Sequence, residues 1–254
     1  MASDTTPGQE SGLLSAQAAL AQELAEVEQI LQNAIVTLYA PLNDLARSQL
    51  KKADSLRCAA VVLAAGVGPT DSVKLRQQRL YLAAALEMLT IALNIHQLLL
   101  AASNQENNPN QRSITGSVIL TGDYCFTQSA ILAAKTEHVR VVEIFSQTLK
   151  TVSERILRKL FTERERLAVG DSATTATTVE TPDSVKLTLC EAGVTGAGIL
   201  IQADANVTTE ALAIVHRLVP LWQSGTSTVP LDTLTMQSLP PAQQQRWRSL
   251  AMTV

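Results

Sequence analysis

Apolar residues recur at helical spacing along most of the chain. Residues 13–35 place apolar side chains three and four positions apart, which is typical of a helix with one apolar face. Residues 80–103 are instead apolar almost throughout, with Glu87, Asn94, His96 and Gln97 in the interior. These polar residues would be costly inside a bilayer. The second pattern therefore predicts a core helix buried on all sides, and no membrane span.

The same periodicity predicts helices over most of the remaining chain and few strands. These lie at about 41–52, 55–65, 115–136, 137–168, 185–203 and 208–222. Residues 1–12 are polar and are expected to be a disordered tail, and the Thr-rich residues 168–184 a mobile loop. Prolines at 230, 240 and 241 predict an irregular tail over 223–254. The expectation is one all-α domain over residues 13–222.

Composition and charge narrow the functional class. The chain has 254 residues, 46% hydrophobic and 3% aromatic, and a formal net charge of −3, so no basic surface points to nucleic acid. Cys58, Cys125 and Cys190 lie far apart, which excludes the spacing of a zinc or redox motif and is typical of buried thiols in a reducing compartment. With no signal-peptide pattern at the N-terminus, we expect a cytoplasmic protein.

Two smaller features have structural interpretations. Gly193, Gly196 and Gly198 follow no predicted strand, so they are expected to permit close helix packing rather than to bind phosphate. The three histidines lack acidic or cysteine neighbours at metal-ligand spacing, so no metal site is predicted.

Three segments resemble, in order and spacing, the trans-type polyprenyl diphosphate synthases. They are LRCAAVVLAAG from Leu56, LAAALEMLTIALNIHQ from Leu82 and SVILTGDYCFTQSAILAA from Ser117. The resemblance includes GDYCF, with Glu87, Ala92 and His96 at the family's spacing. It implies an all-α, isoprenoid-synthase-like helical bundle, truncated at the C-terminal end. It also implies that Asp123 has a capping or structural role near the contact between subunits.

The residues that do the family's chemistry are replaced. In the family, aspartates that follow the counterpart of His96 hold magnesium ions on the diphosphate of an allylic substrate, and Mg²⁺ needs such hard oxygen ligands. Here these positions are Gln97, Leu98, Leu99, Leu100 and Ala101. The second aspartate motif is also missing, because the corresponding region reads WQSGT from Trp222. The resemblance therefore implies neither a magnesium cofactor nor a catalytic residue.

The family's pocket for isopentenyl diphosphate is altered in the same way. Asp54 stands where the family has a lysine, Thr90 where it has a histidine, and Gln111 in place of the first arginine of a pair. Arg57 and Arg112 remain as candidate phosphate contacts. The family's Lys-Thr pair falls near Ser184 and Val185 in this chain.

Ala92 and Leu93 occupy positions where large aromatic residues limit product length in the family. If these residues line a tunnel here, they would leave room for longer products. The alternative is ordinary core packing.

A retained fold without its chemistry suggests three functions. The first is a non-catalytic accessory or regulatory subunit, in complex with a catalytic polyprenyl diphosphate synthase. The second is a stand-alone protein that binds an isoprenoid chain or another lipid, or acts as a scaffold. The third is a divergent active prenyltransferase. A homodimer is the alternative to a heteromer.

Overall fold

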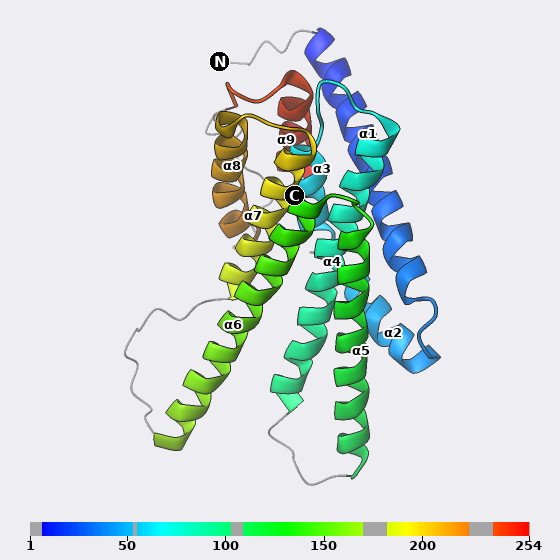
Figure 1. The fold of residues 1–254 in the computed structure, drawn as a ribbon, viewed down its shortest axis with the longest axis vertical. Coiled ribbons are helices and arrows are strands. Elements are labelled where there is room, and N and C mark those ends of the chain that lie inside the picture. Colours follow the sequence, from blue (N-terminus) through cyan, green and yellow to red (C-terminus); the bar gives the residue numbers. More distant parts are fainter. Residues whose placement is uncertain (1–6, 53–54, 103–108, 170–181, 224–235, 254) are drawn as a thin grey trace.

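A computed structural model describes residues 7–52, 55–102, 109–169, 182–223 and 236–253. Within these ranges all regular structure is helical, which confirms the all-α expectation (Figure 1). The helices are α1 (Pro7–Ile35), α2 (Ala40–Leu50), α3 (Arg57–Ala65), α4 (Val73–Ala102), α5 (Pro109–Ala134), α6 (Val139–Val169), α7 (Pro182–Leu200), α8 (Ala205–Gln223) and α9 (Pro241–Thr253).

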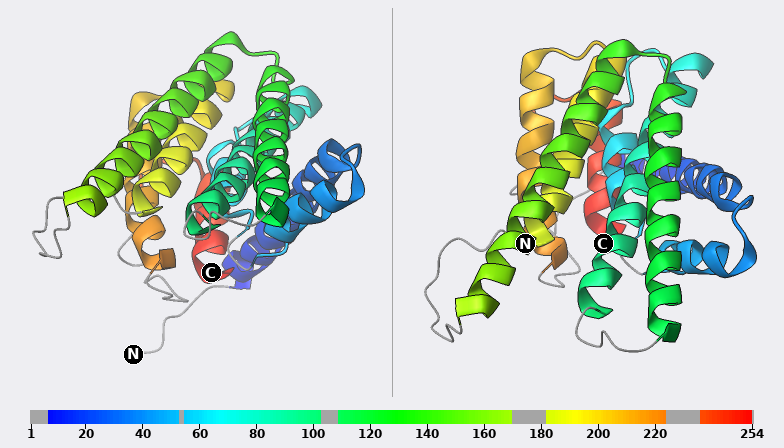
Figure 2. Two further views of the ribbon diagram at one scale, coloured as in Figure 1. Left: turned by 90° about the horizontal axis from the view of Figure 1, so that it is seen from below. Right: turned by 60° about the horizontal axis from the view of Figure 1, so that its bottom comes forward.

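Helices α3 and α4 form the centre of the bundle. Every residue of α3 from Cys58 to Ala65 is buried, because this short Ala- and Val-rich helix is covered by α1, α4, α7 and α9. Helix α4 packs along α5 over much of its length and also contacts α1, α2, α3 and α7 (Figures 1 and 2). Its apolar residues are therefore covered on several sides, as the sequence predicts. No helix within the described residues has the length and hydropathy needed to span a bilayer.

Glycines let α7 approach this centre closely, which confirms their predicted packing role. A Cβ atom on Gly193 would lie 2.7 Å from Val62 Cγ2 on α3, and one on Gly196 would lie 2.9 Å from Leu82 Cδ2 on α4. A Cβ on Gly198 would lie 3.0 Å from Thr208 Oγ1 on α8. A side chain at the first two positions would push α7 away from the core.

A buried ionic cluster joins α1, α4 and α9. The Glu23 carboxylate accepts hydrogen bonds from Arg79 Nη2 at 2.7 Å and from Arg246 Nη1 at 2.7 Å. Arg79, which is fully buried, also donates to both carboxylate oxygens of Asp71, at 2.8 and 2.9 Å. Charges buried in this way are tolerable because each is paired and hydrogen-bonded.

The expectation of an irregular tail over 223–254 is wrong for residues 241–253, which form α9. The indole ring of Trp247 is completely buried, and the Gln243 amide donates to the carbonyls of Ala65 and Val67 at 2.8 and 3.0 Å. Pro241 begins this helix rather than breaking it, because the first-turn N–H groups have no acceptor within a helix. Residues 224–235 lie outside the described ranges.

The expected N-terminal tail is also partly helical, since α1 begins at Pro7 rather than near residue 13. Gly12 lies against α9, where a Cβ would be 2.9 Å from Gln245 Nε2. Contact with a distant helix, which no local pattern reveals, accounts for the longer α1. Of the predicted Thr-rich loop, residues 170–181 lie outside the described ranges, while α6 extends to Val169 and α7 begins at Pro182.

Candidate functional site

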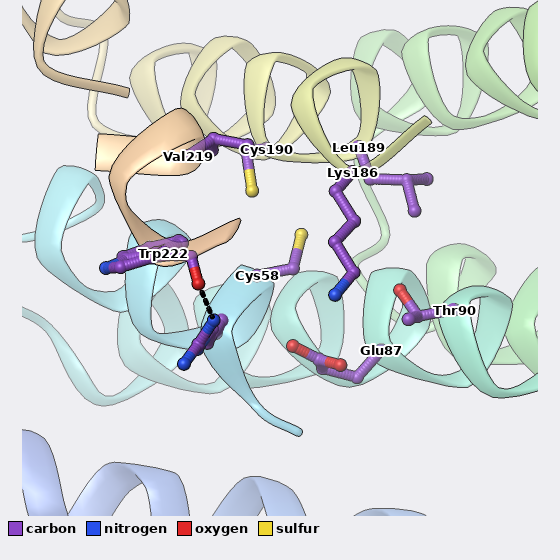
Figure 3. A pocket seen from close by; sticks show the side chains of 9 residues that line it. Cys58, Glu87, Thr90, Lys186, Leu189, Cys190, Val219 and Trp222 are labelled. Carbon is purple, nitrogen blue, oxygen red and sulfur yellow. Dashed lines mark hydrogen bonds between the residues drawn. The ribbon is translucent and has the colours of Figure 1, made fainter. Parts of the chain in front are cut away.

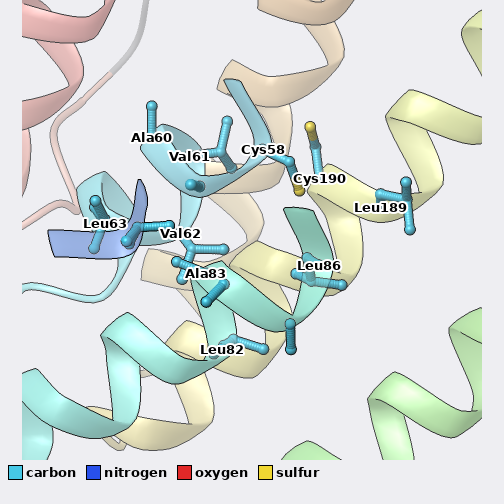
Figure 4. Close-up of a cluster of buried hydrophobic side chains, with 14 of the residues drawn as sticks. Cys58, Ala60, Val61, Val62, Leu63, Leu82, Ala83, Leu86, Leu189 and Cys190 are labelled. Atoms are coloured by element: carbon cyan, nitrogen blue, oxygen red, sulfur yellow. The ribbon is translucent and has the colours of Figure 1, made fainter. Parts of the chain in front are cut away.

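A small cavity lies where α3, α4, α7 and α8 meet (Figure 3). Its volume is about 30 Å³, which is room for one or two water molecules. Nine residues line it: Arg57, Cys58, Glu87, Thr90, Lys186, Leu189, Cys190, Val219 and Trp222. On the α3 side it adjoins the main apolar core, in which Val62, Leu82 and Leu86 pack together (Figure 4).

Glu87 on α4 supplies a cap for α3. The backbone before α3 is left-handed at Leu56, with a φ of 64°, and this residue makes no side-chain cap. Glu87 Oε1 instead accepts the Ala59 N–H at 2.8 Å, in the first turn of α3. A carboxylate is favourable there because the first N–H groups of a helix lack intrahelical partners. The buried Glu87 carboxylate thus stabilises the start of α3.

Arg57 contacts the C-terminal end of α8. Its Nη1 atom donates to the Trp222 carbonyl at 3.2 Å, and its guanidinium lies 5.6 Å from the centroid of the Trp222 ring. A cation is favourable at the C-terminal end of a helix. Lys186 on α7 points into the same space, toward Glu87 (Figure 3). Two cationic side chains and one carboxylate therefore face this cavity.

The structure brings together two of the residues that the resemblance assigns to the isopentenyl diphosphate pocket. Arg57 and Thr90 both line the cavity, and the Thr90 hydroxyl donates to the Leu86 carbonyl at 2.9 Å. Ala92 and Leu93 are buried in the core. Gln97 and Leu98 lie on the exposed part of α4.

The other predicted positions are described less fully. Asp54 lies outside the described residues. Ala101 is on α4, and Gln111 and Arg112 are on α5, but their side chains are not among those that the structure describes.

Sequence reasoning missed Lys186, Trp222 and the pairing of Cys58 with Cys190. The sequence did hold a signal for Lys186. The family's Lys-Thr pair falls near Ser184 and Val185, and Lys186 is the next residue. The contact between the two thiols joins residues that are far apart in the chain. Local spacing therefore held no sign of it.

The motif residues His96 and GDYCF contact one another across α4 and α5. His96 Nε2 lies 3.3 Å from Asp123 Oδ1, and the imidazole stacks on Phe126 with ring centroids 5.1 Å apart. A Cβ on Gly122 would lie 2.5 Å from the His96 ring, so only glycine leaves room for it. Asp123 lies inside α5 rather than at its start, so it pairs with His96 and does not cap the helix.

The residues at the expected magnesium position do not fit that ion. Mg²⁺ is held by carboxylates and phosphate oxygens, whereas Gln97 and Leu98 offer one amide and one hydrocarbon side chain. Among the residues that the structure describes, no three His, Cys, Asp or Glu side chains cluster in a way that could hold a metal ion.

Comparison with known proteins gives a match at the level of structure. No protein-family model and no curated protein sequence matches the chain. A decaprenyl diphosphate synthase from Rhodobacter capsulatus superposes with a TM-score of 0.62 and 21% identity, over 83% of this chain and 64% of that one. A geranylgeranyl pyrophosphate synthase from Lactobacillus brevis gives a TM-score of 0.59 and 17% identity, over 81% and 62%.

An octaprenyl pyrophosphate synthase from Helicobacter pylori is matched over 96% of this chain and 82% of its own, with a TM-score of 0.52 and 16% identity. By contrast, the chain spans less than two thirds of the length of the decaprenyl and geranylgeranyl synthases. At sequence identities this low, the similarity is one of backbone structure. Together these matches show that the chain has the all-α fold of the polyprenyl diphosphate synthases.

Proposed function

We propose that this chain is a non-catalytic subunit that associates with a catalytic polyprenyl diphosphate synthase in isoprenoid biosynthesis. The observation that carries the proposal is the retained fold combined with Gln97 and Leu98 at the place where magnesium-binding aspartates would follow His96. Without carboxylates there, residues 97–101 offer no ligands for the ion that would draw off a diphosphate leaving group.

The cavity supports the same proposal. Condensation of two isoprenoid diphosphates requires room for both substrates, whereas the cavity beside Arg57 and Thr90 holds about 30 Å³. Glu87 and Arg57, which face it, are engaged with the backbone of α3 and of α8. This cavity is also too small for an isoprenoid chain, so a stand-alone lipid-binding protein would have to hold its ligand elsewhere.

As part of the proposal, we place the contact with the partner at an exposed set of apolar residues on α5 and α6. We call it the α5–α6 surface. It consists of Ile119, Leu120, Ile131, Val139, Leu157 and Phe161. Among the described residues, these are six of the eleven large apolar side chains that are well exposed, and Leu120, Val139 and Phe161 are 63, 74 and 62% exposed. Large apolar side chains that water surrounds on a folded domain are candidates for contact with another protein, and these six are the ones that the proposal assigns to the partner.

The decisive experiment is co-expression of this chain with a complete polyprenyl diphosphate synthase from the same genome. Complex formation is measured by size-exclusion chromatography, and prenyl transfer is assayed for each chain alone and for the mixture. We expect co-elution, no turnover by this chain alone, and a change in the rate or the product length of the partner. A fully active partner that never co-elutes with this chain would contradict the proposal.

A variant on the α5–α6 surface tests where the partner binds. Leu120→Arg should abolish or strongly weaken co-elution, because it places a charge in the apolar contact. Leu14→Arg is the matched control, since Leu14 is 67% exposed and lies on α1, which packs chiefly against α2, α3, α4 and α9. Equal loss of binding in both variants would show that the effect is not specific to α5 and α6.

A further inference from the structure

Two cysteine thiols face one another inside the bundle. Cys58 on α3 and Cys190 on α7 are both buried and line the same cavity, with their sulfur atoms pointing toward each other (Figures 3 and 4). They are in hydrogen-bonding contact, which together with burial raises the pKa of Cys58 well above its usual range.

The backbones of α3 and α7 approach closely at this place. One turn beyond the cysteines, a Cβ atom on Gly193 would lie only 2.7 Å from Val62 Cγ2. Helix axes are commonly about 8–10 Å apart, whereas a disulfide requires Cα atoms within about 4.4–6.8 Å. A glycine at the contact lets the two helices approach more closely than larger side chains would allow, which favours a disulfide between them.

We propose that Cys58 and Cys190 are a redox-sensitive pair that hydrogen peroxide converts into a disulfide joining α3 to α7. The inference rests on the facing thiols and the close helix crossing. It is independent of the function proposed above.

The chemistry proceeds in two balanced steps. The Cys190 sulfur attacks one peroxide oxygen, so an S–O bond forms, the O–O bond breaks, and the departing hydroxide leaves with the Cys190 thiol proton as water. The Cys58 sulfur then attacks the Cys190 sulfenic acid, so an S–S bond forms and the S–O bond breaks. The hydroxyl group leaves with the Cys58 proton as a second water. Two thiols are oxidised, and one peroxide is reduced to two waters.

The cavity favours peroxide over larger oxidants. A volume of about 30 Å³ beside both sulfur atoms admits a molecule slightly larger than water, but not a disulfide such as oxidised glutathione. The cross-link would fix α7 against α3 in the wall that also carries Arg57 and Lys186. Oxidation would therefore restrict the movement of these two cations relative to each other.

The third cysteine provides an internal control. Cys125 on α5 is completely buried and does not line this cavity, and burial raises the pKa of its thiol to about 12. Burial is the only cause of that shift, and no second thiol contributes to it, so Cys125 has no partner for a disulfide and should stay reduced.

The test uses the reduced full-length chain and hydrogen peroxide. After oxidation under native conditions, free thiols are blocked with N-ethylmaleimide, and tryptic peptides are analysed by mass spectrometry. We expect peptide 58–74 joined to peptide 187–217, and Cys125 in peptide 113–135 carrying the maleimide. Dithiothreitol should reverse the linkage. The oxidised protein should melt at a higher temperature, because the cross-link restricts the unfolded chain.

Variants separate this pair from other outcomes. Cys125→Ala should retain the linked peptides, whereas Cys190→Ala should lose them and leave Cys58 blocked by maleimide. The inference is overturned if Cys58 and Cys190 of the wild-type chain both carry maleimide after oxidation. It is equally overturned if the linkage involves Cys125 or forms only in urea.

Discussion

Single residues at the contact of α4 and α5 account for the motif that first suggested the fold. Gly122 leaves room for the His96 ring, while Asp123 beside it and Phe126 one turn further along α5 contact that ring. In this chain the motif therefore stabilises helix packing. That explains how GDYCF and His96 can persist together where the aspartates after His96 do not.

Replacement of Gly122 tests this packing role. Gly122→Ala should lower the free energy of unfolding by about 1–3 kcal/mol, because the new methyl group would overlap the His96 ring. Gly116→Ala is the matched control on the same helix, since a Cβ there meets nothing within 4 Å. The control should raise stability by about 0.5–1 kcal/mol, through helix propensity alone. Urea unfolding measures both, and similar effects of the two variants would exclude a special contact at Gly122.

The helices differ in how far the sequence could reveal them. Helix α4 was predictable because its long apolar run between polar segments fits a core helix. Helix α9 was not, because its sequence, PAQQQRWRSLAMT, is rich in polar residues and begins with the second of two prolines. Its Gln243 and Arg246 make buried hydrogen bonds to residues far away in the chain. Local periodicity cannot reveal contacts of this kind.

Helix α9 should be essential for the stability of the bundle. Trp247→Ala should reduce the free energy of unfolding by about 3–5 kcal/mol, because it removes a completely buried indole ring from the core. Arg248→Ala, one residue further along and exposed, should change it by less than about 0.5 kcal/mol. Thermal unfolding followed by circular dichroism compares the two, and a small effect of Trp247→Ala would mean that α9 contributes little to the folded state.

At the scale of the whole molecule, the resemblance predicted the bundle, and it predicted only part of the candidate site. Arg57 and Thr90 were expected near one pocket, and they do line one cavity. The engagement of Arg57 with Trp222 depends on α8 folding back toward α3, across 165 residues of sequence. Contacts of that kind follow from the complete fold and leave no pattern in either segment alone.

Restoring the aspartates should not restore turnover. In the triple variant Gln97→Asp, Leu98→Asp and Ala101→Asp, we expect no condensation of isopentenyl diphosphate with an allylic diphosphate in the presence of Mg²⁺. Thr90 and the small cavity would remain unsuited to the second substrate. Circular dichroism confirms that the variant is folded, and a radiolabelled product assay at high protein concentration provides the readout. Detectable product would show that the missing aspartates were the only defect.

The bond between Glu23 and Arg246 has a consequence for folding during synthesis on the ribosome. It joins residues 223 positions apart, so the contacts that α9 makes with α1 and α3 must be among the last to form. At about 5–20 residues per second, α1 waits on the order of ten seconds or more before its partner emerges. During that interval the apolar surface destined for Trp247 is open to water, and a chaperone would find its binding site there.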